Sequence, residues 1–275
     1  MHNLTLQSQW LHGMPVYENV IGAITLCLSA LAFYLMLTKT PRSVMPFVKY
    51  LILLQASLVL VDLNYCFLVC PIVLFPLNGL ICNGLLCTSF GFSGHAGNSS
   101  MFFAVMFMSV SVIFCFHYKY LTIGRMVDGH TISKTKRVVF RAILFAIFLI
   151  PGILQMGRYR NVETGPEYVK NNFPSLYYLF EISEIHAVAY DPALYPEYIS
   201  VFGLVTLFIM LFSALLGAFF VASTFWSLSQ QSSLSDKTRD LQFKTMLTLI
   251  IQVFRKNLKT NNAIFADANS IFRHQ

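Results

Sequence analysis

Long runs of uncharged, mostly apolar residues separate short polar segments along this chain. The first run covers residues 20–38, and no Lys, Arg, Asp or Glu occurs between Asp62 and Lys119. A helix needs about 20 apolar residues to cross a hydrocarbon layer of ~30 Å. The pattern therefore predicts an all-α fold, a polytopic bundle of membrane helices. The five complete spans are placed at residues 20–38, 50–74, 94–117, 138–156 and 199–228.

The stretch between the second and third spans is too long for one helix, so it must contain a break. The helix-breaking residues there are Pro71, Pro76, Asn78 and Gly79. The apolar piece 80–92 is too short to cross, so we expect it to lie in the interface or to begin the third span early. A sixth apolar run near the C-terminus, 245–254, covers about half of the required length and predicts only a partial span.

The composition agrees with this class of protein. Hydrophobic residues make up 56% of the 275 residues and charged residues only 11%, against about 25% charge in soluble domains. This excludes a soluble or disordered chain, and 6 Cys over this length exclude a disulfide-stapled scaffold. The net charge of +7 would suit nucleic acid. Because topology places the basic residues of membrane proteins, we expect the lipid bilayer and no nucleic acid as a partner.

The basic residues predict the orientation of the chain. Twelve Lys and Arg lie in segments that the spans place on one side of the membrane, and three lie on the other. The positive-inside rule then puts the N-terminus outside, in a multi-pass protein of the plasma membrane. The sequon at Asn3 would lie outside and is a candidate glycosylation site. The sequon at Asn98 falls at the mouth of the third span, where we expect no glycan.

Patterns of catalytic residues are missing from the sequence. No two histidines stand three or four residues apart, and there is no phosphate-binding loop and no Gly-x-Ser-x-Gly elbow. We therefore expect no enzyme activity, no metal and no cofactor. Cys82 and Cys87 lie on the outer side, where a disulfide would be chemically allowed, but we expect free thiols. The outer loop, 157–198, has no cysteine to tie it to the third span.

Three residues are candidates for a ligand pocket or a switch. Asp62 is the one acid between Glu18 and Asp128 and is predicted in the middle of the second span, where an ionisable group is costly and often functional. Asn64 is a possible partner in a polar network, with Gln55. The competing interpretation makes Asp62 a protonated, purely structural tie. His95 lies near the outer mouth of the third span, within reach of a ligand or simply in solvent at the start of a helix.

The cytoplasmic ends of the third and fourth spans carry a basic face. Its residues are His117, Tyr118 and Lys119, which end the third span, and Lys134, Lys136 and Arg137, which open the fourth. One interpretation is topological anchoring. The other is a docking surface for an intracellular partner or anionic lipid, and the two are compatible.

Several short motifs resemble one receptor family. They are Lys49-Tyr50 at the start of the second span, the proline-flanked run 71–76, Cys115 to Lys119, Tyr190-Asp191-Pro192, and Leu241 to Lys244 with Gln252. Over residues 15–253 the chain is similar to the nematode serpentine chemoreceptors, class I (Sri) or the related class H (Srh). The resemblance implies a seven-helix receptor with its N-terminus outside, located in sensory neuron cilia, that detects small molecules and couples to a heterotrimeric G protein. An Asp-Arg-Tyr triplet is missing after the third span, where His117-Tyr118-Lys119 stands.

The C-terminal segment departs from that family. We expect residues 1–253 to form the receptor bundle, whereas residues 254–275 are polar where the rest of the sixth span and a seventh would stand. A misplaced exon boundary or a truncated copy that no longer signals would explain this tail. The leading functional hypothesis is a chemosensory G-protein-coupled receptor. The alternative is a membrane transporter or channel subunit, which the lack of internal repeats disfavours.

Overall fold

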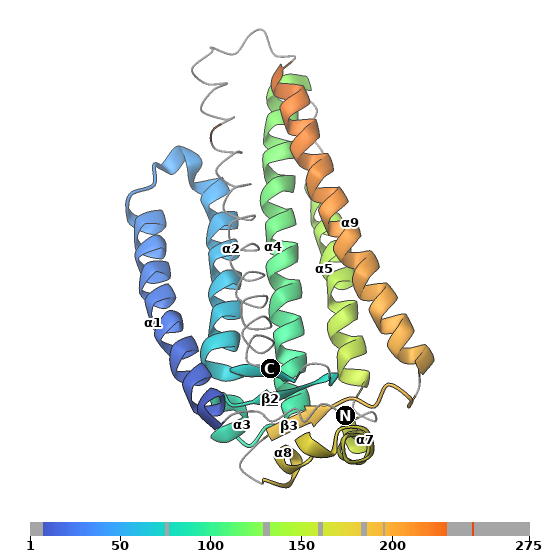
Figure 1. Cartoon of the computed structure of the whole chain (residues 1–275). Helices are drawn as coiled ribbons and strands as arrows, with labels where there is room; N and C mark the ends of the chain where they lie inside the picture. The colour runs from blue at the N-terminus through green and yellow to red at the C-terminus, as the bar shows by residue number, and fades with distance from the viewer. Residues whose placement is uncertain are drawn as a thin grey trace. The chain divides into compact units, whose positions relative to one another are not determined.

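Five long helices dominate the computed structural model, as the spacing of charges predicts (Figure 1). The structure describes residues 8–74, 77–128, 133–158, 162–182, 186–194, 196–229 and 244. The long helices are α1 (Ser8–Thr38), α2 (Met45–Leu63), α4 (Gly94–Asp128), α5 (Lys134–Gly157) and α9 (Pro196–Ser229). Each is long and apolar enough to cross a membrane. The predicted polytopic helical class and its five spans are therefore confirmed among the described residues, while the partial span 245–254 and the tail lie outside them.

The second predicted span ends too late. A short 3-10 turn (Arg42–Val44) precedes α2, and a π-helical turn, η2 (Asn64–Leu68), extends it. The helix then stops, because Cys70 adopts a positive φ of 42° and Pro71 follows it. A residue before proline is disfavoured in helical conformation. Residues 71–74, which we assigned to the span, form a strand instead.

A three-stranded antiparallel sheet lies beyond the end of α2, and the sequence analysis did not predict it. Its strands, in spatial order, are β1 (Pro71–Leu74), β2 (Gly79–Cys82) and β3 (His186–Ala189). In this register Ile72 faces Ile81, and Leu80 faces Val188. The piece 80–92 thus supplies a strand and the short helix α3 (Leu85–Thr88), and it does not begin the third span early.

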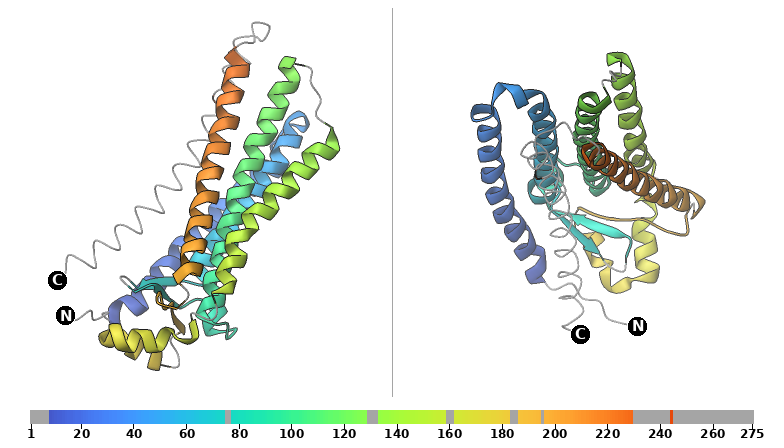
Figure 2. Two further views of the ribbon diagram at one scale, coloured as in Figure 1. Left: turned by 90° about the vertical axis from the view of Figure 1, so that its right-hand side faces the viewer. Right: turned by 90° about the horizontal axis from the view of Figure 1, so that it is seen from above.

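The loop between the fourth and fifth spans folds onto this sheet. It contains α7 (Gly165–Asn172), a 3-10 turn (Pro174–Leu176), α8 (Tyr178–Glu181) and β3. Its apolar side chains share a core with the hairpin of β1 and β2. That core consists of Leu74, Leu77, Ile81, Val169, Leu176, Leu179 and Ala189. Figures 1 and 2 show the sheet, α7 and α8 at the same end of α1 and α2. We call this the sheet end.

The expectation of free thiols at Cys82 and Cys87 was wrong. The two residues form a disulfide with a Cα–Cα distance of 6.0 Å. It joins the end of β2 to α3, because the chain turns at Asn83 and Gly84 and so brings together two cysteines that are five positions apart. The other cysteines, Cys27, Cys66, Cys70 and Cys115, take part in no disulfide among the described residues.

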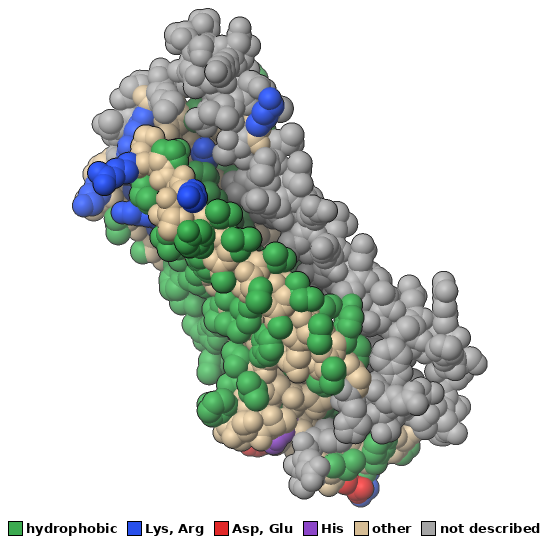
Figure 3. Space-filling model, turned by 90° about the vertical axis from the view of Figure 1, so that its left-hand side faces the viewer, with side chains coloured by type: hydrophobic (Ala, Val, Ile, Leu, Met, Phe, Trp, Pro, Cys, Tyr) green, Lys and Arg blue, Asp and Glu red, His purple; other side chains and the backbone are tan. Residues whose placement is uncertain are grey.

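The chain divides into two compact units, and the boundaries between them fall within α4 and α9. The first contains residues 1–115 and 133–215, and the second contains residues 116–132 and 216–275. In the first unit, large apolar side chains remain exposed along α1, such as Val16, Val20 and Leu28 at 62%, 55% and 61% exposure. Figure 3 shows this apolar flank. Such a surface suits contact with lipid chains.

Candidate functional site

The hydroxyl group of Tyr190 forms the centre of a buried polar cluster at the sheet end. Tyr190 directly follows β3, and its side chain is only 2% exposed. Its oxygen lies 3.0 Å from Nδ1 of His95, 3.0 Å from Nδ2 of Asn98 and 3.0 Å from Nε2 of Gln155. The first two partners come from α4 and the third from α5. One hydroxyl therefore joins two long helices to the loop that carries β3.

The hydrogen-bond pattern fixes the proton positions within the cluster. A phenol hydroxyl donates one hydrogen and accepts two hydrogen bonds. The amide groups of Asn98 and Gln155 both donate to Tyr190, so the phenol donates its own hydrogen to Nδ1 of His95. The imidazole then carries its proton on Nε2, which lies 3.2 Å from the carbonyl oxygen of Met156. Burial raises the pKa of the Tyr190 phenol above its usual value, which keeps the hydroxyl protonated.

Arg158 brings a positive charge to this cluster. It follows the last residue of α5 and is 5% exposed. Its Cζ lies 4.1 Å from the ring centroid of Tyr190 and 5.2 Å from that of Phe202, and its Nη1 donates to Oε1 of Gln155 at 3.3 Å. Its Nε and Nη2 are buried without a hydrogen-bond partner among the described residues. Burial lowers the pKa of the guanidinium, and the phenols of Tyr190 and Tyr198 oppose this shift.

A second polar contact joins α2 to α4. Asn64 is 4% exposed, and its Oδ1 accepts a hydrogen bond of 2.8 Å from the hydroxyl of Ser100. Its Nδ2 donates to the carbonyl oxygen of Leu60 at 2.9 Å. Both polar atoms of this amide are therefore satisfied, as buried amides require.

The comparisons with known proteins agree with a receptor. Residues 7–260 match the family described as the serpentine type seven-transmembrane GPCR chemoreceptor Sri. The chain belongs to the Sri chemoreceptor family. No curated protein and no solved structure matches this Sri chain.

The structure separates the three pocket candidates of the Sri chain. His95 is only 5% exposed and belongs to the Tyr190 cluster, so the expectation of a solvated histidine was wrong. Asn64 is not part of that cluster, and it contacts α4 through the hydroxyl of Ser100. Asp62 does not lie mid-span, because it is the penultimate residue of α2 and the apolar element ends at Leu68. It stands two positions before Asn64, roughly 200° around an ideal helix, so the two side chains leave on different sides.

Two further expectations concern amide side chains of the Sri chain. Gln55, expected beside Asp62, donates to the hydroxyl of Ser29 on α1 at 2.9 Å and so joins the first two helices. Asn98 uses its amide nitrogen to bind Tyr190, which gives a physical reason why its sequon is unsuited to a glycan. Asn3 lies outside the described residues. Among those described, no group of three or more His, Cys, Asp or Glu residues has an arrangement that fits a metal ion.

The predicted basic face is divided between the two units. In the first unit, Lys134 and Lys136 are exposed and Arg137 is half-buried at the start of α5. In the second unit, His117 and Lys119 are buried, at 6% and 9% exposure, and Tyr118 is half-buried. The ring centroid of His117 lies 5.4 Å from that of Phe220. His117 and Lys119 therefore do not form an exposed basic surface, whereas the lysines of α5 do.

The sequence analysis missed Gln155, Arg158 and Tyr190 as members of the site. Gln155 and Arg158 stand three residues apart at the end of an apolar span, so their spacing places both on one face of a helical turn. That spacing was a usable signal. Nothing in the sequence indicated that Tyr190 would lie against them, because β-pairing brings it there from a distant part of the chain.

Proposed function

We propose that this Sri chain is a chemosensory G-protein-coupled receptor that detects small molecules. The observation that carries the proposal is the family match over residues 7–260. The five membrane-capable helices agree with it. The sheet end would receive the ligand, and the opposite end would contact a heterotrimeric G protein.

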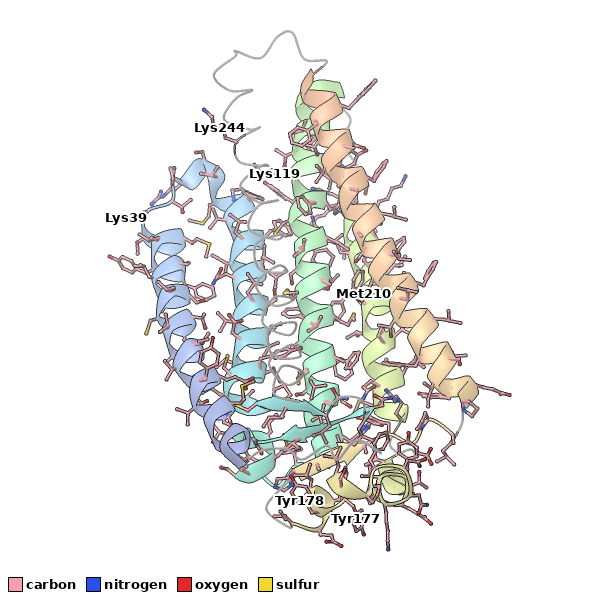
Figure 4. The ribbon with its side chains drawn as sticks, viewed as in Figure 1. Lys39, Lys119, Tyr177, Tyr178, Met210 and Lys244 are labelled. Carbon is pink, nitrogen blue, oxygen red and sulfur yellow. A yellow bond between two sulfur atoms is a disulfide. The ribbon has the colours of Figure 1, made fainter. Side chains whose placement is uncertain are left out.

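The proposed orientation puts the N-terminus and the sheet end outside the cell, at the plasma membrane. In the first unit, Tyr177 and Tyr178 lie at the sheet end and Lys39 at the opposite end (Figure 4). The exposed Lys134 and Lys136 begin α5, and Gln155 near its other end donates to Tyr190 at the sheet end. Cationic residues accumulate on the cytoplasmic side. The disulfide at the sheet end supports the same orientation, since disulfides persist in oxidising compartments.

The Tyr190 cluster provides a physical route from ligand to helices. A ligand that alters any one of its hydrogen bonds changes how α4 and α5 are held together at the sheet end. It would thereby favour one of two helix arrangements. We propose His95 as a switch residue of this cluster, with Asn64 and Asp62 on the neighbouring helix.

The proposed G-protein surface is the opposite end of the helices. In the first unit its candidate residues are Lys134, Lys136 and Arg137 at the start of α5. In the second unit the candidate is the half-buried Tyr118, between the buried His117 and Lys119. The exposed lysines of α5 are the more accessible part. A charge-assisted contact with acidic groups of a partner suits them.

Expression of the full chain in cultured cells tests the proposal in two steps. An N-terminal tag that reacts with a membrane-impermeant dye would establish the orientation. Resonance energy transfer between G-protein subunits, recorded while a small-molecule panel is applied, would establish coupling. A surface-expressed chain that passes current or carries solute without G-protein activation would favour the transporter or channel alternative instead.

A further inference from the structure

The guanidinium of Arg158 has one complete edge without a partner. Its Nη1 donates to Gln155, whereas Nε and Nη2 have no hydrogen-bond partner among the described residues, although both are buried. These two nitrogens form the side-on edge of the guanidinium, where two parallel N–H groups match the two oxygens of a carboxylate. The bond from Nη1 to Gln155 therefore leaves Nε and Nη2 available for bidentate recognition.

A buried guanidinium with two unbonded nitrogens lowers the stability of the fold unless a further group binds to them. A buried charge is normally paired or fully hydrogen-bonded, because burial without partners carries a large desolvation penalty. Arg158 is 5% exposed, and its charge interacts with the phenols of Tyr190 and Tyr198 and with no carboxylate in the described part of the chain. The segment from 157 to 198 contains six acidic residues. The described acids of that segment, Glu163, Glu167, Glu181, Asp191 and Glu197, do not pair with Arg158.

The neighbouring groups limit what an added partner can be. The hydroxyl of Tyr190 is fully used by His95, Asn98 and Gln155, so it offers no further hydrogen bond. The site thus supplies one positive charge and one bidentate edge, which suits a single negative charge better than a doubly charged phosphate. The ring of Phe202 lies beside the guanidinium and packs edge-on against Phe102, at a centroid distance of 5.6 Å. Apolar surface therefore adjoins the charge.

We propose that Arg158 is a recognition residue for small monocarboxylates with an apolar body. The carboxylate takes Nε and Nη2, while Nη1 keeps its bond to Gln155. Because Gln155 also donates to Tyr190, the occupied arginine is connected through a single side chain to the cluster that holds α4 and α5. This deepens the proposed chemosensory function and rests on it for its physiological meaning. The binding step itself does not depend on G-protein coupling.

The test uses the full chain, purified and placed in nanodiscs of uncharged phosphatidylcholine. The probes are hexanoate and phenylacetate, each compared with its neutral amide, hexanamide or phenylacetamide. Equilibrium binding and the thermal unfolding midpoint are recorded at neutral pH. We expect each carboxylate to bind about tenfold or more tightly than its amide, since charge-assisted bidentate pairs are among the stronger hydrogen bonds.

Variants assign that preference to Arg158. Arg158→Gln should remove the preference for carboxylate over amide. Arg158→Lys, which keeps the charge but loses the planar edge, should weaken carboxylate binding by about tenfold. Lys170→Gln is the matched control, because Lys170 is an exposed cation of the same loop, and it should bind like the parent chain. Arg158→Gln should still fold, because removing an unpaired buried charge lifts a desolvation penalty.

The possible outcomes separate this site from the proposed function. The site is overturned if the parent chain binds carboxylates and amides equally or not at all, or if Arg158→Gln keeps the preference. It is also overturned if phosphatidylserine in the nanodisc displaces hexanoate, because a lipid carboxylate would then be the occupant. Carboxylate binding without G-protein activation would uphold the site and count against the receptor. G-protein activation by other compounds, in a chain that does not bind carboxylates, would count against the site and support the receptor.

Discussion

The hydroxyl of Tyr190 lies 3.0 Å from Nδ1 of His95, although 95 positions separate the two residues in the chain. The rings meet edge-on, with centroids 5.8 Å apart. The backbone N–H of Tyr190 also donates to the carbonyl oxygen of Asn78 at 2.9 Å, beside the strand pairing of β2 and β3. The loop before α9 is thus held to the start of α4 without a disulfide between them. The position of this loop depends on the phenol, on the sheet and on the apolar core that it shares with β1 and β2.

Replacement of Tyr190 by Phe tests the importance of this phenol. The ring would remain, but Nδ1 of His95 and the amides of Asn98 and Gln155 would each lose a partner. A buried polar group left unsatisfied costs about 1–3 kcal/mol. We expect Tyr190→Phe to lower the free energy of unfolding by about 2 kcal/mol or more, measured by denaturant or thermal unfolding in detergent. Tyr17→Phe is the control, because Tyr17 is 62% exposed. Equal stability of the two variants would contradict the described hydrogen-bond network.

The sequence predicts the helices well because a span leaves a strong local signal. About 20 apolar residues without charge admit few other structures, and each predicted span overlaps a helix of the structure. The residues 71–74 and 79–82 are also apolar, and short apolar runs do not distinguish a strand from a buried helix. The two runs pair with each other as a hairpin, but the third strand of the sheet, β3, comes more than a hundred residues later. That information is not local.

In the polar site, too, local sequence signals predict part of the structure, and contacts between distant residues determine the rest. His95 was selected because it stands at a span end, and the structure does place it in the cluster. Arg158 was counted only as one of the few basic residues on the outer side. Its burial depends on the rings of Tyr190 and Phe202, which come from later parts of the chain. Pairwise spacing along α5 predicts the contact with Gln155, but it does not predict the aromatic contacts.

Two glycines in long helices provide a matched pair for the packing of α4 against α5. A methyl group at Gly152 of α5 would lie 2.5 Å from a ring carbon of Phe103 on α4, whereas one at Gly203 of α9 meets nothing within 4 Å. Alanine is the better helix former by about 1 kcal/mol, but overpacking costs about 1–3 kcal/mol. We expect Gly152→Ala to lower the unfolding midpoint and Gly203→Ala to leave it unchanged or raise it. A rise for both variants would show that α4 and α5 do not approach closely at Gly152.

The disulfide predicts a definite count of reactive thiols. The chain has six cysteines, and the four outside this bond take part in no disulfide among the described residues. Denatured but unreduced protein should therefore take up four maleimide groups by intact mass, and reduced protein should take up six. Loss of the bond between Cys82 and Cys87, in a double replacement by serine, should cost about 2 kcal/mol, as the loop-closure relation gives for so short a loop. Uptake of six groups without reduction would mean that the bond does not form in the membrane protein.

The contact between Asn64 and Ser100 predicts an energetic coupling between α2 and α4. The hydroxyl of Ser100 lies 2.8 Å from Oδ1 of Asn64, and it also lies 2.8 Å from the carbonyl oxygen of Gly97. One hydrogen is shared between two acceptors, so the coupling should be smaller than for an exclusive bond. A double-mutant cycle with Asn64→Ala and Ser100→Ala should give about 0.5–1 kcal/mol of non-additivity in unfolding free energy. Ser109→Ala, combined with Asn64→Ala, is the control, because the hydroxyl of Ser109 bonds only within α4, to the carbonyl oxygen of Val105. Strict additivity in both cycles would show that the contact between Asn64 and Ser100 does not couple α2 to α4, and Asn64 would then be an unsuitable place for a switch.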